Sequence, residues 1–132
     1  MKIIVVDDEP VIADTLVDIL NGEGHEAVAV SDGASAIRWA QLIRPDAVIT
    51  DVIMSGMDGV ETAKAIMKIL PKCRIILFSG QAASVDLLER ARADGYDFEV
   101  LAKPINPTIL LEVLGLAGNA GSSEKLSETA KT

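Results

Sequence analysis

Short apolar runs alternate with longer segments of helical periodicity, and this alternation repeats five times along the chain. The apolar runs are rich in aliphatic residues and have the length of buried strands; they cover residues 3–6, 26–30, 47–51, 74–79 and 98–103. The segments that follow them predict helices over residues 10–22, about 34–43, about 59–70, 84–95 and about 107–116. The fifth strand is the weakest of the set.

Helix boundaries carry the expected local signals. Pro10 suits the first turn of a helix, where its missing N–H costs nothing, and Gly22 suits the end. The second helix has two candidate caps, Ser31 and Asp32. Apolar residues of the first helix follow the spacing of one buried face; they are Ile12, Leu16, Ile19 and Leu20.

Strands that alternate with single helices predict a parallel sheet, because a parallel connection needs a long crossover and that crossover is right-handed. The fold class is therefore α/β, a three-layer α/β/α sandwich. In open sheets of this kind, ligands bind beyond the carboxyl ends of the strands. The residues that close each strand are the first place to look for function.

Composition narrows the class of protein further. The 132 residues fit one domain, and the low aromatic content of 3% predicts a core of aliphatic side chains. With 20 acidic and 12 basic residues the formal charge is −8, which disfavours direct binding to nucleic acid or an anionic membrane. The single Cys73 is expected to be a partly buried apolar residue. The opening "MKIIVVDD" does not resemble a signal sequence, so we expect a cytoplasmic location.

Polar residues close four of the five strands. Asp7 and Asp8 follow the first, Asp51 ends the third, Ser79 ends the fourth and Lys103 ends the fifth. In a parallel sheet all of these lie at one edge. Three nearby carboxylates repel one another, and a hard divalent cation relieves that repulsion. With oxygen ligands and no His or Cys among them, Mg²⁺ is the expected ion.

This set of groups suits phosphoryl transfer onto a carboxylate. Asp51 would share the metal and keep one oxygen free as nucleophile, while Lys103 and Ser79 meet phosphoryl oxygens. Each group alone has an ordinary structural explanation, such as a helix entry for the acids or a turn for Ser79. Their joint placement favours function, and Asp51 is interpreted as a phosphoacceptor.

Four motifs of the sequence resemble those of the receiver domain of bacterial two-component response regulators, and the resemblance covers residues 1–116. They are "IIVVDDEP" (3–10), "DAVITDVIMSGMDGVE" (46–61), "IILFSG" (75–80) and "LAKP" (101–104). The resemblance implies a flavodoxin-like five-stranded sheet of order 2-1-3-4-5. It implies a signalling domain, not an enzyme acting on separate substrates, that supports only its own phosphorylation and dephosphorylation.

The resemblance also assigns roles to individual residues. Asp51 matches the acceptor of a phosphoryl group from a kinase phosphohistidine, and Asp7 and Asp8 match the acidic pair that holds Mg²⁺. The backbone carbonyl of Ile53 matches a further metal ligand. Ser79 corresponds to the switch hydroxyl and Lys103 to the phosphate-binding lysine.

Two positions depart from the family pattern. Ser55, followed by Gly56, stands where the family usually has proline, so the loop after the third strand loses a rigid φ and gains freedom. Val100 stands where the family commonly has a Tyr or Phe that moves inward on activation. Phe98 is near in sequence but does not share that position.

The expected partners are a sensor histidine kinase or phosphotransfer protein, and a downstream protein or an effector domain outside these residues. A homodimer through the helix face of residues 84–95 is a further possibility. Residues 117–132 are small and polar and predict a tail or the start of a linker. Two alternatives remain: a phosphate-independent interaction module, and a Mg²⁺-dependent phosphatase with an aspartyl nucleophile. The second needs a general acid at position 53, where Ile cannot serve.

Overall fold

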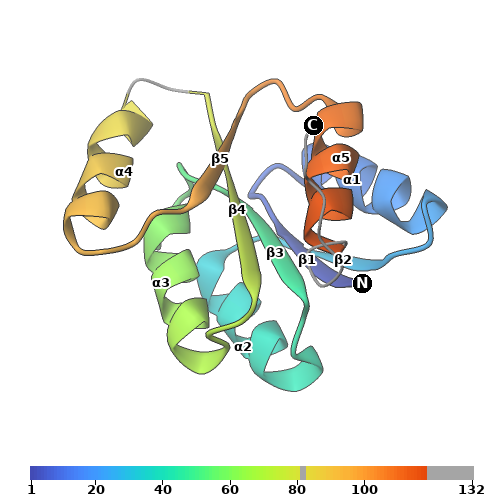
Figure 1. Ribbon diagram of the computed structural model, residues 1–132, viewed down its shortest axis with the longest axis horizontal. Coiled ribbons are helices and arrows are strands. Elements are labelled where there is room, and N and C mark those ends of the chain that lie inside the picture. Colours follow the sequence, from blue (N-terminus) through green and yellow to red (C-terminus); the bar gives the residue numbers. More distant parts are fainter. Residues whose placement is uncertain (81–82, 119–132) are drawn as a thin grey trace.

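A five-stranded parallel sheet forms the centre of the computed structural model, which describes residues 1–80 and 83–118, with side chains described for 1–80 and 84–115 (Figure 1). The strand order is β2-β1-β3-β4-β5, as predicted. The strands are β1 (Lys2–Val6), β2 (Glu26–Val30), β3 (Ala47–Asp51), β4 (Arg74–Ser79) and β5 (Glu99–Ala102). All pairings between neighbouring strands are parallel.

One helix follows each strand. The helices are α1 (Pro10–Gly22), α2 (Gly33–Ile43), α3 (Gly59–Ile69), α4 (Ala83–Ala93) and α5 (Pro107–Gly118). The helix α4 ends two residues before Gly95, which has φ +93° and so stands in a conformation that favours glycine. The helix α5 continues two residues past the predicted end at 116. The rest of the predicted tail, residues 119–132, lies outside the described residues.

Side chains alternate between the two faces of the sheet, and each face has its own core. Ile4 and Val6 pack with α2 and α3 residues, whereas Ile3 and Val5 pack with residues of α1 and α5. The helices α1 and α5 lie on one side of the sheet in Figure 1, and α2, α3 and α4 lie on the other. Strands covered on both faces account for the nearly continuous apolar runs in the sequence.

Local capping fixes where α2 and α3 begin. Asp32, not Ser31, caps α2, because its side chain accepts the Ser35 N–H at 2.7 Å. Asp58 and Glu61 form a capping box at the start of α3. In that box the Asp58 carboxylate accepts the Glu61 N–H at 2.8 Å, and Glu61 accepts the Asp58 N–H at 3.2 Å.

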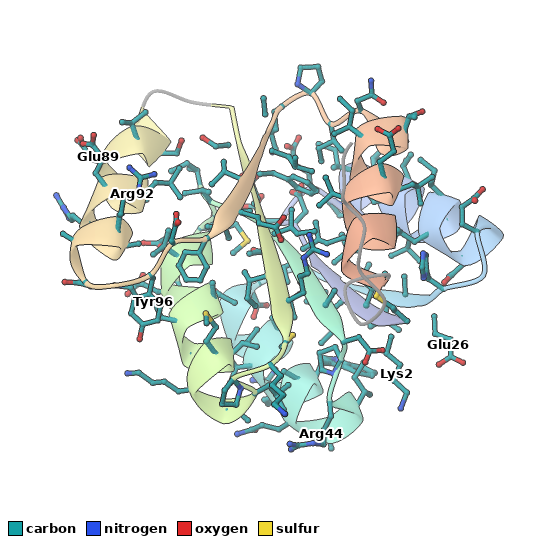
Figure 2. All side chains as sticks on the ribbon, viewed as in Figure 1. Lys2, Glu26, Arg44, Glu89, Arg92 and Tyr96 are labelled. Atoms are coloured by element: carbon teal, nitrogen blue, oxygen red, sulfur yellow. The ribbon has the colours of Figure 1, made fainter. Side chains whose placement is uncertain are left out.

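The surface is charged, and the interior is mainly aliphatic, with Phe78 as a buried aromatic side chain. Glu89 on α4 extends away from the sheet (Figure 2), and Arg92 of the same helix is exposed. Cys73 is buried against the core beside α3, as predicted. Among the helices within residues 1–80 and 83–118, none has the length and hydropathy needed to cross a membrane.

Candidate functional site

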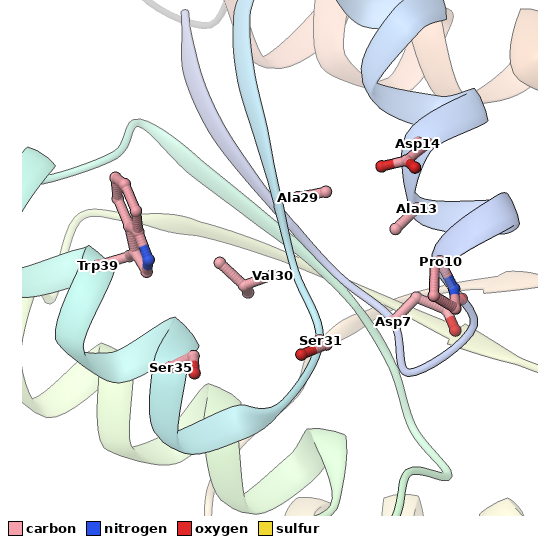
Figure 3. A pocket seen from close by; sticks show the side chains of 9 residues that line it. All are labelled: Asp7, Pro10, Ala13, Asp14, Ala29, Val30, Ser31, Ser35 and Trp39. Atoms are coloured by element: carbon pink, nitrogen blue, oxygen red, sulfur yellow. The ribbon is translucent and has the colours of Figure 1, made fainter.

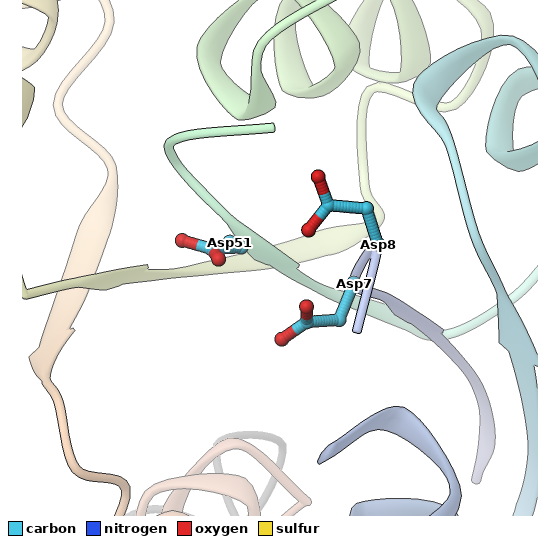
Figure 4. A group of neighbouring side chains, drawn as sticks. All are labelled: Asp7, Asp8 and Asp51. Atoms are coloured by element: carbon cyan, nitrogen blue, oxygen red, sulfur yellow. The ribbon is translucent and has the colours of Figure 1, made fainter. Parts of the chain in front are cut away.

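Three carboxylates meet at the carboxyl ends of β1 and β3. Asp7 and Asp51 are buried, Asp8 is exposed, and each offers an oxygen that lies within 4.8 Å of an oxygen of the other two. Figure 4 shows the three carboxyl groups extending to the same side of the strand ends. The sequence predicted this convergence.

Strand register explains why the acids meet. Val6 of β1 stands beside Thr50 of β3, so the next residues along the two chains, Asp7 and Asp51, lie side by side at the carboxyl edge of the sheet. The Asp7 N–H donates to the Val30 carbonyl at 3.1 Å, which continues the β1–β2 pairing for one more residue. The backbone therefore places Asp7 at the edge of the sheet independently of its side chain.

Lys103 reaches this cluster from the end of β5. Its Nζ lies 2.7 Å from Asp51 Oδ2 and 4.0 Å from Asp7 Oδ2. The Lys103 N–H donates to the Ser79 carbonyl at 3.1 Å, so the backbone pairing of β4 and β5 extends up to the lysine. A Cβ at Gly80 would lie 2.8 Å from Lys103 Cβ, so glycine there leaves room for the lysine stem.

Burial and charge act in opposite directions on these groups. Burial raises the pKa of Asp7 above its ordinary value; the Glu9 N–H and the Lys103 charge oppose this, and the charge of Asp51 adds to it. Partial burial disfavours the charged form of Lys103. The hydrogen bond to Asp51 and the negative charges of Asp51 and Asp7 outweigh it, so the pKa of Lys103 is raised. The site therefore carries excess negative charge in a partly desolvated place.

Asp7 Oδ2 is a buried oxygen of the cluster that accepts no hydrogen bond within the described residues. Asp7 Oδ1 accepts the Glu9 N–H at 2.9 Å, but Asp7 Oδ2 is buried and has no hydrogen bond within residues 1–80 and 83–118. Leaving such an atom unpaired is costly unless a cation or water meets it. A buried carboxylate oxygen that accepts no hydrogen bond, together with two further carboxylates, offers the oxygen ligands that a hard divalent cation requires.

Two further predicted residues lie close by. The Ile53 N–H donates to Asp51 Oδ1 at 3.3 Å, so Ile53 is held beside the Asp51 carboxylate. The Ser79 hydroxyl shares a short hydrogen bond with the hydroxyl of Ser84, which is fully buried in the first turn of α4. The sequence pattern does not point to Ser84, because a serine at a helix start is usually a local capping residue.

Ser55 is a second residue of the site that the sequence pattern does not reveal. Its N–H and its hydroxyl both donate to Asp8 Oδ2, at 3.1 and 3.4 Å. The sequence indicated only that a proline was missing and that the loop had gained freedom. The structure instead ties the loop at this residue to the acidic cluster.

The aromatic half of the family pattern is absent at its expected position. Val100 lies on β5 with 41% of its surface exposed. Phe98 precedes the strand and stacks on Tyr96, with ring centroids 5.6 Å apart. Lys64 of α3 lies 5.2 Å from the centre of the Tyr96 ring. These rings therefore pack on α3 and take no position equivalent to that of Val100.

A pocket of about 320 Å³ adjoins the cluster on the β2 side. Asp7 and Asp14 line it from the β1–α1 segment, and Ser35 and Trp39 line it from α2 (Figure 3). Trp39 is 41% exposed and is the one tryptophan of the sequence. Its indole therefore offers a spectroscopic signal from a pocket that shares Asp7 with the carboxylate cluster.

Comparison with known proteins gives consistent matches. The family model described as "Response regulator receiver domain" matches residues 3–115. The chemotaxis protein CheY of Thermotoga maritima is 31% identical over 114 residues, which is 86% of this chain and 93% of that protein. The DNA-binding response regulator MtrA of Mycolicibacterium smegmatis is 28% identical over 110 residues, 83% of this chain. The chain spans about half the length of MtrA, 47%.

Solved structures agree with the sequence matches. A response regulator receiver domain protein from Clostridium thermocellum superimposes with a TM-score of 0.81 at 30% identity, covering 91% of this chain and 95% of that one. Chemotaxis protein CheY4 of Vibrio cholerae gives 0.76 at 30% identity, covering 86% of this chain and 95% of that one.

Proposed function

This chain belongs to the response regulator receiver domain family, and from that premise we propose that Asp51 accepts a phosphoryl group in a Mg²⁺-dependent reaction. The donor is the phosphohistidine of a sensor kinase or of a phosphotransfer protein. The observation that carries the proposal is the contact of 2.7 Å between Lys103 Nζ and Asp51 Oδ2, within a cluster of three carboxylates. An acid with no chemical role would be expected on the surface, without an ammonium contact and two neighbouring carboxylates.

Asp51 is suited to act as the nucleophile. Its carboxylate is held from two sides, by the Ile53 N–H on Oδ1 and by Lys103 on Oδ2. In the proposed transfer, one Asp51 oxygen forms a bond to phosphorus while the P–N bond of the phosphohistidine breaks. The electron pair of that bond stays on the imidazole nitrogen, which takes up a proton, and the product is an aspartyl phosphate.

Lys103 and Ser79 are the proposed partners of the phosphoryl oxygens. A flexible ammonium follows the added negative charge, so Lys103 exchanges part of its contact with Asp51 for the new oxygens. Ser79 supplies a hydroxyl from the neighbouring strand end. Its present hydrogen bond runs to Ser84 in α4, so a Ser79 that turns toward the phosphoryl group gives up that bond.

Asp7, Asp8 and Asp51, with the backbone carbonyl of Ile53, would hold the Mg²⁺. Asp7 Oδ2, which is buried and accepts no hydrogen bond within the described residues, supports this fit. When bound, the ion neutralises charge that gathers on the acceptor and the phosphoryl oxygens. Asp7 is fixed through the Glu9 N–H, and Asp8 is fixed through Ser55, so this chain orients its own ligands.

The output is a change of shape read by another protein. Phosphorylation adds nearly two negative charges and three acceptor oxygens next to Ser79 and Lys103. This biases the position of α4 through the Ser79–Ser84 contact. The reader is a partner protein, a second copy through the α4 face, or a further domain, since relatives such as MtrA are about twice as long.

Mass spectrometry with acetyl phosphate and Mg²⁺ tests the proposal. We expect intact protein to gain one phosphoryl group, and Asp51→Asn to gain none. Asp18→Asn, an exposed acid on α1, is the matched control and should label like the parent. Equal labelling of Asp51→Asn, or labelling of the parent that persists in excess EDTA, would overturn the assignment. The same assay discriminates against a phosphate-independent interaction module, which would label in neither form.

A further inference from the structure

Ser55 makes two hydrogen bonds that the usual residue at its position cannot make. Its N–H lies 3.1 Å and its hydroxyl 3.4 Å from Asp8 Oδ2. Proline has no N–H and no hydroxyl, so the family's usual residue four positions after the acceptor would leave Asp8 Oδ2 without both donors. This contact is therefore a property of this chain, created by the substitution itself.

The contact joins the two loops that carry the carboxylate cluster. Asp8 lies in the loop between β1 and α1, Ser55 lies in the loop between β3 and α3, and 47 positions separate them in sequence. The second loop also contains Ile53, the proposed carbonyl ligand. A carboxylate has about four lone-pair sites, so the two bonds from Ser55 leave acceptor capacity for a cation.

The orientation of the Asp8 side chain depends on such a contact more than the orientations of Asp7 and Asp51 do. Asp7 and Asp51 are buried and held by the backbone, whereas Asp8 is exposed and its side chain is open to solvent. Repulsion from two adjacent carboxylates favours rotamers of an exposed acid that point away from them. The donors of Ser55 act against that repulsion and hold the Asp8 carboxyl group near the other two.

We propose that Ser55 is a positioning residue that orients Asp8 for the divalent cation. This inference rests on the proposed function, because it assumes that the cluster binds Mg²⁺. Asp8 is ordered before the ion arrives, so less side-chain freedom is lost on binding. A hydrogen-bond donor on the Asp8 carboxylate also withdraws some electron density from it, which by itself would weaken its bond to a metal ion. Removing such outer partners nevertheless weakens metal binding in general, by about 10- to 100-fold, so orientation dominates.

Calorimetric titration with MgCl₂ alone, without any phosphodonor, tests the proposal. Three variants separate the two donors: Ser55→Ala keeps the N–H, Ser55→Thr keeps both donors, and Ser55→Pro removes both. We expect Ser55→Pro to bind Mg²⁺ about tenfold more weakly than the parent. Ser55→Ala should fall between them, and Ser55→Thr should match the parent. Trp39 fluorescence provides a second readout of the same titration.

Folding is controlled independently of metal. Thermal unfolding of each variant in metal-free buffer identifies any variant that is not folded at the titration temperature. In the same buffer, a double-mutant cycle of Ser55→Pro with Asp8→Ala removes both donors and the acceptor, and so measures the contact without an ion. A coupling between the two sites supports the contact, and strict additivity contradicts it.

The failures are distinguishable. If the parent does not bind Mg²⁺, the proposed function itself is wrong. If the parent binds and Ser55→Pro binds equally tightly, only the role of Ser55 is wrong. Equal losses for Ser55→Thr and Ser55→Pro would also overturn it, because Thr retains both donors.

Discussion

The ammonium group of Lys103 lies 2.7 Å from Asp51 Oδ2, although the two residues are 52 positions apart in sequence. The ammonium group thus contacts one oxygen of the carboxylate that we propose as the phosphoacceptor. The side chain of Lys103 is 24% exposed, so the pair is only partly desolvated. A pair in such a place contributes modestly to stability, but its position makes it important to chemistry at Asp51.

Lys103→Ala should therefore affect phosphorylation more than folding. We expect the rate of labelling by acetyl phosphate to fall by about 100-fold, because a donor aimed at the developing charge is lost. The free energy of unfolding should change by about 1 kcal/mol or less. Time-resolved mass spectrometry and urea denaturation measure the two quantities.

The exposed Lys72→Ala is a matched control, since it removes the same charge from the surface. Its labelling rate should stay close to that of the parent. If Lys103→Ala is unfolded in the absence of urea, Lys103 is chiefly a structural residue and the assignment to phosphoryl binding is wrong.

Asp7→Asn should stabilise the metal-free protein at neutral pH. Burial raises the pKa of Asp7 in the folded state above the ordinary value of 3.8. At a pH above 3.8, the Asp7 carboxyl group is therefore protonated to a greater extent in the folded state than in the unfolded state. Stability consequently falls as the pH rises through the raised pKa, and the ionised group is unfavourable above it. Asn removes that charge, and its side-chain oxygen can still accept the Glu9 N–H.

Urea denaturation in EDTA, at about pH 7 and at about pH 4, measures this effect. The gain of Asp7→Asn over the parent should be present near neutrality and shrink toward the lower pH, where the parent's Asp7 becomes protonated. Adding Mg²⁺ to about 100 times its dissociation constant should stabilise the parent by about 2.7 kcal/mol and the variant by less. A destabilised Asp7→Asn at neutral pH would contradict the account.

Much of this architecture could be predicted from the sequence because the local sequence signals of each strand and helix agree with the structure that it adopts. Aliphatic runs give the strands, Pro10 marks the start of α1, and Asp32, one of the two candidate caps, begins α2 in the structure. The gathering of Asp7 and Asp51 also follows from pattern alone, since parallel strands bring their carboxyl ends to one edge. Matching residue by residue to a family adds the strand order.

The contacts of Ser55 and Ser84 could not be predicted in the same way. Ser55 contacts a residue that lies far away in the sequence, and Ser84, at the start of a helix, contacts a residue of another element. The hydrophobic periodicity of the sequence contains no information about such contacts. The departure at Ser55 was visible in the sequence. Its consequence was not, because the loss of a proline indicates freedom while the gain of a donor becomes visible only once its acceptor is placed.

Gly59→Ala should damage both fold and site, whereas the same change at Gly115 should be favourable. A Cβ on Gly59 would lie 1.9 Å from the backbone oxygen of Asp51, and backbone cannot move aside as a flexible side chain can. The Gly59 N–H also donates to the Val52 carbonyl at 2.8 Å, which holds the start of α3 against the end of β3. We expect a loss of at least about 2 kcal/mol in the free energy of unfolding.

Gly115 lies on the exposed side of α5, and a Cβ there meets nothing within 4 Å. Gly115→Ala should stabilise the protein by up to about 1 kcal/mol, because alanine is the better helix former. Thermal unfolding compares the two variants, and acetyl phosphate labelling shows whether displaced backbone at Asp51 slows the reaction in Gly59→Ala only. If Gly59→Ala is as stable and as reactive as the parent, the close approach of α3 to Asp51 does not exist in solution.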